Sequence, residues 1–361
     1  MHTFRSINYS LVTLLASTLL IGSENVFSSA DENINLNYIR GTDKNDSLVG
    51  TASNDKIDGV AGNDLLSGLE GDDFIYGGKG NDRLNGNAGN DIINGEEGND
   101  TVDGGVGDDL IRGNDGNDSL SGGDGKDVLN GDKGKDKLNG GNDDDTLVGD
   151  SGDDSLNGGD GDDLLDGSDD NDTIVSEAGD DALYGNYGND KLDAGDGRDI
   201  LLGGDGNDTL LGGNGEDNLT GGFGKDVLTG GDGRDNFIFT DTRDSSADKS
   251  NRDVIKDFEP GKDHIDLSTF SNPLLQGDFK EVSETDRTDA NTVTTTSALV
   301  VKTSSSMQLI VENQNLSGGG TLGKVWFENG ILYVSLDNNN SAEFSVEVQG
   351  IRDFKLNDFI F

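Results

Sequence analysis

The sequence predicts an all-β protein whose largest part is a solenoid of two parallel sheets, and three observations lead to this fold class. Between Gly41 and Ile238, 198 residues divide into 22 repeats of nine with no insertion or deletion. The sixth place is Asp and the eighth is apolar in every repeat, whereas the first and fourth places are mostly Gly. A fixed short period is typical of solenoids, in which each repeat packs against its neighbours.

The apolar eighth place predicts a very short strand with one side chain turned inward. The six residues before it are predicted to form a turn, because glycines at its first, second and fourth places permit positive φ. Two repeats make one coil of strand, turn, strand and turn, so 22 repeats give eleven coils. Stacked about 4.8 Å apart, these coils form two parallel sheets with turns along both edges.

The core of such a stack is too thin to hold it together. Each repeat buries one aliphatic side chain, which falls well short of the conformational entropy lost when nine residues are ordered. Backbone hydrogen bonds add little net free energy, and neighbouring acidic turns repel one another. The sequence therefore predicts that a bound ion supplies the difference.

Composition indicates the sign of that ion. The chain has 361 residues, of which 72 are acidic and 26 basic, and its formal net charge is −46. This charge argues against nucleic acid or an anionic membrane surface as a partner, because both are held by Lys and Arg. It favours cations. The chain has no cysteine and only two histidines, so disulfides and zinc–thiolate sites are excluded.

The use of aspartate in the turns indicates calcium. The 22 repeats contain only five glutamates, whereas a surface selected for negative charge alone would use Glu freely. Oxygen ligands without His or Cys favour Ca²⁺ over zinc or copper, and Mg²⁺ fits less well because it demands tight octahedral geometry.

Competing motifs fail in detail. A dinucleotide-binding loop would need Gly at Thr209, no Gly-Lys-Ser or Gly-Lys-Thr follows any turn, and an EF-hand loop has twelve residues. Paired carboxylates such as Asp162 and Asp163 do not stand out as catalytic among so many equivalent positions.

The segment Gly203–Leu211, GGDGNDTLL, fits G-G-x-G-x-D-x-U-x and resembles the RTX (repeats-in-toxin) calcium-binding nonapeptide family. The resemblance implies a right-handed parallel β-roll of about eleven coils. Its ions would lie between the turns of repeats n and n+2, held by both place-six aspartates and by turn carbonyls. Asp199 would then pair with Asp217, and Asp208 with Asp226. Two edges of eleven turns would hold up to about twenty Ca²⁺ ions.

The implied calcium ligands are the place-six aspartates from the third repeat onward: Asp64, Asp73, Asp82, Asp91, Asp100, Asp109, Asp118, Asp127, Asp136, Asp145, Asp154, Asp163, Asp172, Asp181, Asp190, Asp199, Asp208, Asp217, Asp226 and Asp235. The first coil is predicted to be a degenerate cap with poor sites, because Lys44 and Ser53 replace glycine there. Asp143 and Asp170 replace glycine in two later turns, where each either distorts the turn or adds a ligand.

Residues 1–30 are predicted to be a secretory signal peptide. Arg5 precedes the apolar run Leu11–Ile21, which is too short to span a bilayer, and Ser28-Ser29-Ala30 offers small residues for cleavage. The alternatives are an uncleaved anchor or a misassigned start codon. Residues 31–40 are a short lead into the repeats.

Residues 239–361 are predicted to form a separate β-sandwich-like module. The stretches 253–268 and 325–351 resemble the segment that follows the roll in serralysin-type metalloproteases. Phe344, Val346 and Val348 alternate with polar residues, which predicts a half-buried strand. Residues 282–306 are rich in Thr and Ser and are predicted to be a loop. Residues 358–361 resemble a type I secretion signal, and otherwise form a last strand.

The serralysin likeness does not bring the protease. The zinc motif H-E-x-x-H is absent, residues 31–40 leave no room for a catalytic domain, and His264, predicted to lie in a loop, is the only histidine after the signal peptide. The chain is therefore predicted to be non-enzymatic. An enzyme of another type would have to reside in residues 239–361.

The favoured interpretation is a secreted, extracellular calcium-binding protein that folds on binding Ca²⁺ and has a structural, adhesive or matrix role. The alternative is a calcium-dependent polysaccharide-binding module related to those of alginate epimerases, with ligands held by calcium bridges or by Arg198, Lys225 and Arg234. The two export signals imply different routes, and a mature protein that begins at Asp31 would favour the general secretory route.

Overall fold

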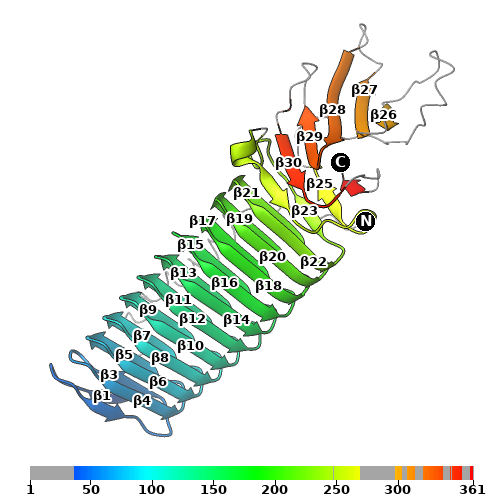
Figure 1. Ribbon diagram of the computed structural model, residues 1–361. Coiled ribbons are helices and arrows are strands. Elements are labelled where there is room, and N and C mark those ends of the chain that lie inside the picture. Colours follow the sequence, from blue (N-terminus) through cyan, green and yellow to red (C-terminus); the bar gives the residue numbers. More distant parts are fainter. Residues whose placement is uncertain are drawn as a thin grey trace. The chain divides into compact units, whose positions relative to one another are not determined.

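The computed structural model describes residues 36–246, 248–268, 297–302, 307–313, 320–335, 342, 344–351 and 358–360. The chain divides into two compact units, Met1–Val148 and Gly149–Phe361. In both units the nine-residue repeats form parallel β-solenoid, about eleven turns in all, so the predicted all-β class and β-roll are confirmed (Figure 1). The described residues contain no α-helix, only a 3-10 turn at Lys249–Asn251. None of their helices is long and apolar enough to cross a membrane.

The strands of the first unit pair in parallel with the next strand but one, and so form two sheets. The odd sheet contains β1 (Asn37–Arg40), β3 (Asp55–Asp58), β5 (Phe74–Lys79), β7 (Ile92–Glu97), β9 (Leu110–Asp115) and β11 (Val128–Lys133). The even sheet contains β2 (Ser47–Val49), β4 (Leu65–Glu70), β6 (Arg83–Ala88), β8 (Thr101–Val106), β10 (Ser119–Asp124) and β12 (Lys137–Asn142). β13 (Thr146–Ser151) contains the boundary between the units.

The second unit repeats this arrangement. Its even strands are β14 (Ser155–Asp160), β16 (Thr173–Ala178), β18 (Lys191–Gly197), β20 (Thr209–Gly215) and β22 (Val227–Gly233). Its odd strands are β15 (Leu164–Asp169), β17 (Ala182–Tyr187), β19 (Ile200–Gly206), β21 (Asn218–Gly224) and β23 (Asn236–Ile238).

The strands are longer than the sequence predicts. Most contain six or seven residues, running from the seventh place of one repeat to the third or fourth place of the next, so the turn is shorter than six residues. The reason is the pairing of identical coils. Gly195 and Gly213, both at the second place, lie in register although each has positive φ, and the ladder continues to Gly197 and Gly215.

The core is one column of place-eight side chains in each sheet. From Ile57 to Phe237 these side chains are 0–2% exposed, which confirms the inward-facing apolar residue of each predicted strand. Leu48, in the first repeat, is only half-buried. Because a single apolar residue per repeat reaches the interior, the sheets enclose a narrow core.

The outer faces of the two sheets differ in character. From β5 to β11, the place-seven column of the odd sheet is apolar and half-buried, and it runs through Phe74, Ile92, Leu110 and Val128. From β6 to β12, the same column of the even sheet is polar and exposed, and it runs through Arg83, Thr101, Ser119 and Lys137. Alternate repeats therefore carry different outward residues around the same inward ones.

Both sheets of the second unit continue past the last repeat. β24 (Asp253–Ile255) pairs in parallel with β22, and β25 (His264–Asp266) pairs in parallel with β23. β30 (Phe344–Val348) and β31 (Phe359–Ile360) then add to β24 and β25. His264 thus lies in a strand, and the predicted loop position is wrong, because its backbone takes the place of the next coil.

An antiparallel sheet joins the even sheet of this unit at β30. It contains β26 (Ser297–Lys302), β27 (Met307–Asn313), β28 (Gly320–Glu328) and β29 (Ile331–Ser335). β26 lies within the segment 282–306, so the prediction of a loop there is wrong at residues 297–302; residues 282–296 and 303–306 lie outside the described residues.

The predicted strand at Phe344 is present, but its polar residue is not on a solvated face. Ser345 is fully buried, because Arg252 Nε donates to its Oγ (2.7 Å) and Ser245 Oγ donates to its carbonyl (2.6 Å). The predicted signal peptide, residues 1–30, lies outside the described residues.

Candidate calcium-binding turns

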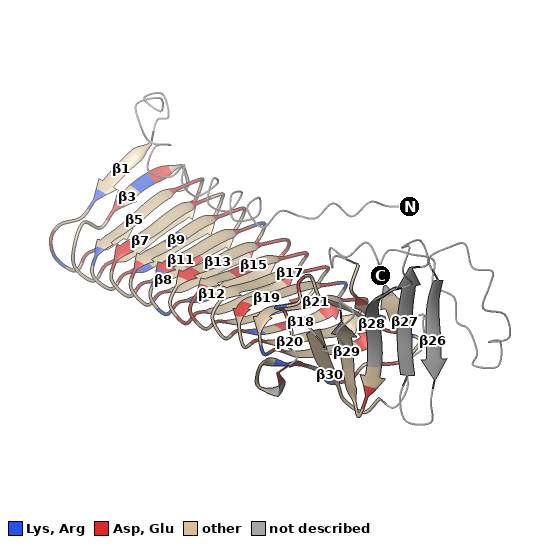
Figure 2. Cartoon of the chain, turned by 90° about the horizontal axis from the view of Figure 1, so that it is seen from above, with Lys and Arg blue, Asp and Glu red and all other residues tan. Residues whose placement is uncertain are grey.

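The place-six aspartates are buried in spite of their charge. From Asp64 to Asp235 all twenty are 0–3% exposed. Each follows a turn at the edge of a sheet, and Figure 2 shows acidic residues recurring along these turns. A buried carboxylate is unfavourable unless it is hydrogen-bonded, paired with a charge or bound to a metal, so each position requires an account of both its oxygens.

One carboxylate oxygen of each of these aspartates accepts a hydrogen bond from the neighbouring coil. The N–H of Asp190 donates to Oδ1 of Asp208 (2.8 Å), and the N–H of Asp208 donates to Oδ1 of Asp226 (2.8 Å). The N–H of Asp199 likewise donates to Oδ1 of Asp217 (2.9 Å). The structure therefore brings together the aspartates of repeats n and n+2, the pairs that the family resemblance implies.

The other oxygen has no donor. Among the described residues, Oδ2 is buried without a hydrogen-bond partner at the place-six aspartates from Asp64 to Asp127 and from Asp172 to Asp235. A backbone oxygen lies nearby. A Cβ added to Gly203 would lie 2.4 Å from Asp208 Oδ2 and 2.5 Å from the carbonyl oxygen of Gly221. A carboxylate oxygen and a backbone carbonyl oxygen that both lie beside Gly203 are the ligand types that a hard cation prefers.

Burial also raises the pKa of these carboxyls. Loss of water raises the pKa of Asp109 to about 7 and that of Asp172 to about 8, while a backbone N–H opposes the rise. Asp226 reaches about 8 for the same reason. A cation beside the carboxylate removes the penalty on the charged form.

Backbone groups of the turns would have to complete any metal site. No group of three or more acidic or histidine side chains in the described residues could hold a metal by itself, so carbonyl oxygens must complete any site. The second place has positive φ in every repeat from Val60 onward. At the fourth place, a Cβ on Gly206 would lie 1.4 Å from the carbonyl oxygen of Gly188, so only glycine lets these coils stack.

The two aspartates that replace fourth-place glycines change the backbone of their turns locally. Asp143 has φ of 75° and Asp170 has φ of 78°, a region that Asp tolerates better than most residues, whereas nearby fourth-place glycines such as Gly152 and Gly179 have φ of 128° and 149°. Of the two predicted possibilities, a local distortion of the turn is therefore observed.

Sequence reasoning missed two members of the aspartate columns. Asp226 N–H donates to Oδ1 of Asp253 (2.9 Å), and Asp235 N–H donates to Oδ1 of Asp263 (3.2 Å). Asp253 is fully buried with Oδ2 lacking a donor, and burial raises its pKa to about 9. A signal for Asp253 was available, because Asp253-Val-Ile255 keeps the sixth-to-eighth pattern of the repeat and begins two nines after Asp235.

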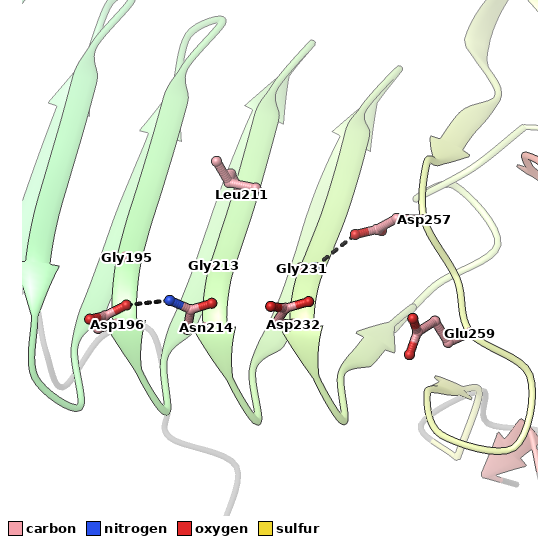
Figure 3. Close-up of a pocket in the computed structure, with 9 residues that line it drawn as sticks. All are labelled: Gly195, Asp196, Leu211, Gly213, Asn214, Gly231, Asp232, Asp257 and Glu259. Atoms are coloured by element: carbon pink, nitrogen blue, oxygen red, sulfur yellow. Dashed lines mark hydrogen bonds between the residues drawn. The ribbon is translucent and has the colours of Figure 1, made fainter.

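A shallow cavity of about 550 Å³ lies beside these columns in the second unit, between β18, β20 and β22 and the segment at Asp257 (Figure 3). The side chain of Asp257 accepts hydrogen bonds from the N–H groups of Gly230 (3.0 Å) and Gly231 (2.8 Å). Asp232 and Glu259 in its lining are exposed to solvent, unlike the place-six aspartates. The unsatisfied oxygens therefore belong to the turns and not to this cavity.

These features define an acidic β-solenoid whose stacked turns hold buried carboxylates suited to oxygen-preferring cations. The chain matches the model of the RTX calcium-binding nonapeptide repeat in overlapping segments at residues 37–66, 67–102, 76–111, 103–138, 139–174, 166–201, 176–210 and 202–237. It belongs to this family, whose repeats bind calcium.

Other comparisons add little. No curated protein matches the chain. Among solved structures, the chain is similar to the solution structure of the AlgE6R3 subunit from the Azotobacter vinelandii mannuronan C5-epimerase. The identity is 23%, the match covers 54% of this chain and 80% of that one, and the TM-score is 0.23.

Proposed function

We propose that the protein is a secreted, non-enzymatic calcium-binding protein that folds outside the cell when Ca²⁺ fills its turns, and that it serves a structural, adhesive or matrix-associated role. The observation that carries the proposal is the column of buried Oδ2 atoms without donors from Asp64 to Asp127 and from Asp172 to Asp235. Asp253, whose Oδ2 also lacks a donor, extends the candidate ligands beyond the repeats.

The extracellular location in this proposal follows from the calcium concentration that such sites require. Extracellular calcium modules have dissociation constants of about 10⁻⁴–10⁻³ M, far above the calcium level of a cytosol. With its turns empty, a chain of net charge −46 repels itself and stays unfolded for export. Outside the cell, calcium both neutralises the turns and links neighbouring coils.

The test is far-UV circular dichroism of the full chain with millimolar calcium and after chelation. Loss of the β signal on chelation and its recovery with calcium, but not with magnesium, are expected. An unchanged β signal in chelator would overturn the proposal. Mass spectrometry of the exported protein decides the route, since a start at Asp31 supports the general secretory route and an intact Met1 supports the other.

A second candidate function, binding of an anionic polysaccharide, is favoured by one surface. The exposed column of the even sheet carries Arg83 and Lys137 three strand spacings apart, about 14 Å, with Thr101 and Ser119 between them. Neither cation forms an ion pair within the described part of the chain. Of the cations expected from the sequence, Arg198 instead pairs with an acidic side chain of its own chain.

Retention on immobilised alginate in calcium buffer tests this surface. The variant R83Q/K137Q is expected to elute at lower salt than the wild type, while K79Q/K133Q, which removes two exposed lysines of the odd sheet that pair with acidic side chains, is the charge-matched control. Equal retention of R83Q/K137Q and wild type would exclude the surface. Retention that survives chelation would exclude calcium bridging.

A further inference from the structure

The turns at the two ends of the repeat region differ from those between them in how the aspartate is satisfied. In the first repeat, Thr42 donates to Asp46 Oδ2 through both its backbone N–H (2.6 Å) and its hydroxyl (2.9 Å). In the second, Thr51 does the same to Asp55 Oδ2, at 2.5 and 3.1 Å, while Asp55 Oδ1 is buried without a hydrogen-bond partner. Oδ2 is the oxygen that lacks a donor in the inner turns.

The same device occurs in the nine residues that follow the last repeat. Thr240 donates to Asp244 Oδ2 through its N–H (2.5 Å) and its hydroxyl (2.9 Å), and Asp241 N–H adds a third bond (2.9 Å). Thr240 and Asp244 stand at the second and sixth places of a further nine, residues 239–247, as Thr42 and Asp46 do in the first repeat. The threonine closure therefore occurs at both ends of the repeat region.

The backbone of these turns differs as well. Every second-place residue from Val60 to Gly231 has positive φ, whereas Thr42 and Thr51 at the same place do not. A β-branched residue rarely adopts positive φ, so threonine at the second place favours the other turn conformation. Threonine thus supplies two donors and selects the backbone that directs them at the carboxylate.

We propose that Thr42, Thr51 and Thr240 determine ion occupancy: the turns that they close hold no calcium, because their donors occupy the carboxylate oxygen that an ion uses in the inner turns. The inference rests on the proposed function, since it concerns where calcium binds. A carboxylate that accepts several hydrogen bonds is stabilised in its charged form without a cation. The ends of the repeat region are therefore ion-independent caps, and the solenoid is calcium-dependent only between them.

The direct test is the anomalous difference density of full-length protein crystallised in calcium. We expect peaks between the inner turns, beside the aspartates from Asp64 to Asp235, and none at Asp46, Asp55 or Asp244. A peak at any of these three carboxylates would overturn the inference. Absence of peaks at the inner turns would instead overturn the proposed function, so the two failures are distinguishable.

A gain-of-site variant tests the role of threonine. The quadruple variant T42G/K44G/T51G/S53G gives the first two turns the glycines of the inner ones, and it is expected to bind about two more calcium ions per chain by equilibrium dialysis. Thr101→Val, on an exposed strand, is the control and should leave the count unchanged. A folded quadruple variant with wild-type calcium content would refute the assignment. If that variant fails to fold, T42G/T51G, which removes the hydroxyls and the β-branched side chains that select the turn conformation, must raise the calcium content for the assignment to hold.

Discussion

Replacement of Asp208 by Asn is expected to change the stability of the protein in opposite directions with and without calcium. The side chain is 1% exposed, its Oδ1 accepts the N–H of Asp190 at 2.8 Å, and its Oδ2 has no donor. An amide keeps the acceptor but removes the charge. With calcium bound, the change strips a buried cation of a charged partner, and loss of one partner of a buried ion pair costs about 3–5 kcal/mol.

Without calcium, the effect of Asp208→Asn on the free energy of unfolding is expected to reverse in sign. Burial raises the pKa of Asp208 to about 7, so a charged carboxylate is unfavourable in the empty turn, and a neutral amide relieves that penalty. Asp205→Asn is the matched control, because Asp205 is exposed three residues earlier on the same coil.

Urea unfolding followed by circular dichroism measures both effects. In saturating calcium, Asp208→Asn should lower the free energy of unfolding by the stated amount and Asp205→Asn by less than about 0.5 kcal/mol. In chelator with enough osmolyte to populate folded protein, Asp208→Asn should be at least as stable as wild type. Equal losses for the two variants in calcium would refute the assignment of Asp208 as a ligand.

Three further predictions concern stability. In chelator, acidification should restore the β signal in circular dichroism. The pKa of Asp109 is raised from 3.8 in the unfolded chain to about 7, so the folded ion-free state binds the proton more tightly and loses stability as pH rises between those values. No gain of β signal near pH 4 would contradict this. Gly206→Ala should prevent stacking of its coil, because the added Cβ would lie 1.4 Å from a carbonyl oxygen. Gly350→Ala, also at positive φ but with no atom within 4 Å, should lower the free energy of unfolding by only about 1 kcal/mol. Similar melting temperatures for the two variants would count against the stacking argument. Leu210→Ala should cost about 2–5 kcal/mol in calcium by urea unfolding, and a loss below 1 kcal/mol would show that the narrow core tolerates a cavity.

Periodicity was sufficient to predict the coils and the inward residue, because each depends only on position within the repeat, whereas the pairing of Asp199 with Asp217 came from the family resemblance. Strand length was not predictable in the same way. Gly195 and Gly213 belong to strands because identical neighbours pair with them, and a single repeat carries no sign of that partner.

For the candidate site too, spacing predicts one part of the arrangement and only the fold reveals the rest. A regular Asp column follows from spacing, which gives Asp244 eighteen residues after Asp226, but the fold of the intervening chain instead brings Asp253 to Asp226. The threonine closures were missed because Thr42 reads as an ordinary turn residue until its hydroxyl is seen on Asp46. Ser345 was placed on the wrong face because its partner, Arg252, is 93 residues away in sequence.

The contrast between the two outer faces constrains how such a gene can lengthen or shorten. The repeat unit has nine residues, but Phe74 and Ile92 of one face are separated by two repeats, as are Arg83 and Thr101 of the other. Loss of a single repeat would preserve every turn and every inward side chain, yet it would exchange the apolar and polar faces for all coils beyond the deletion. Duplication or loss of eighteen residues keeps each face continuous, so the heritable unit of this solenoid is the pair of repeats.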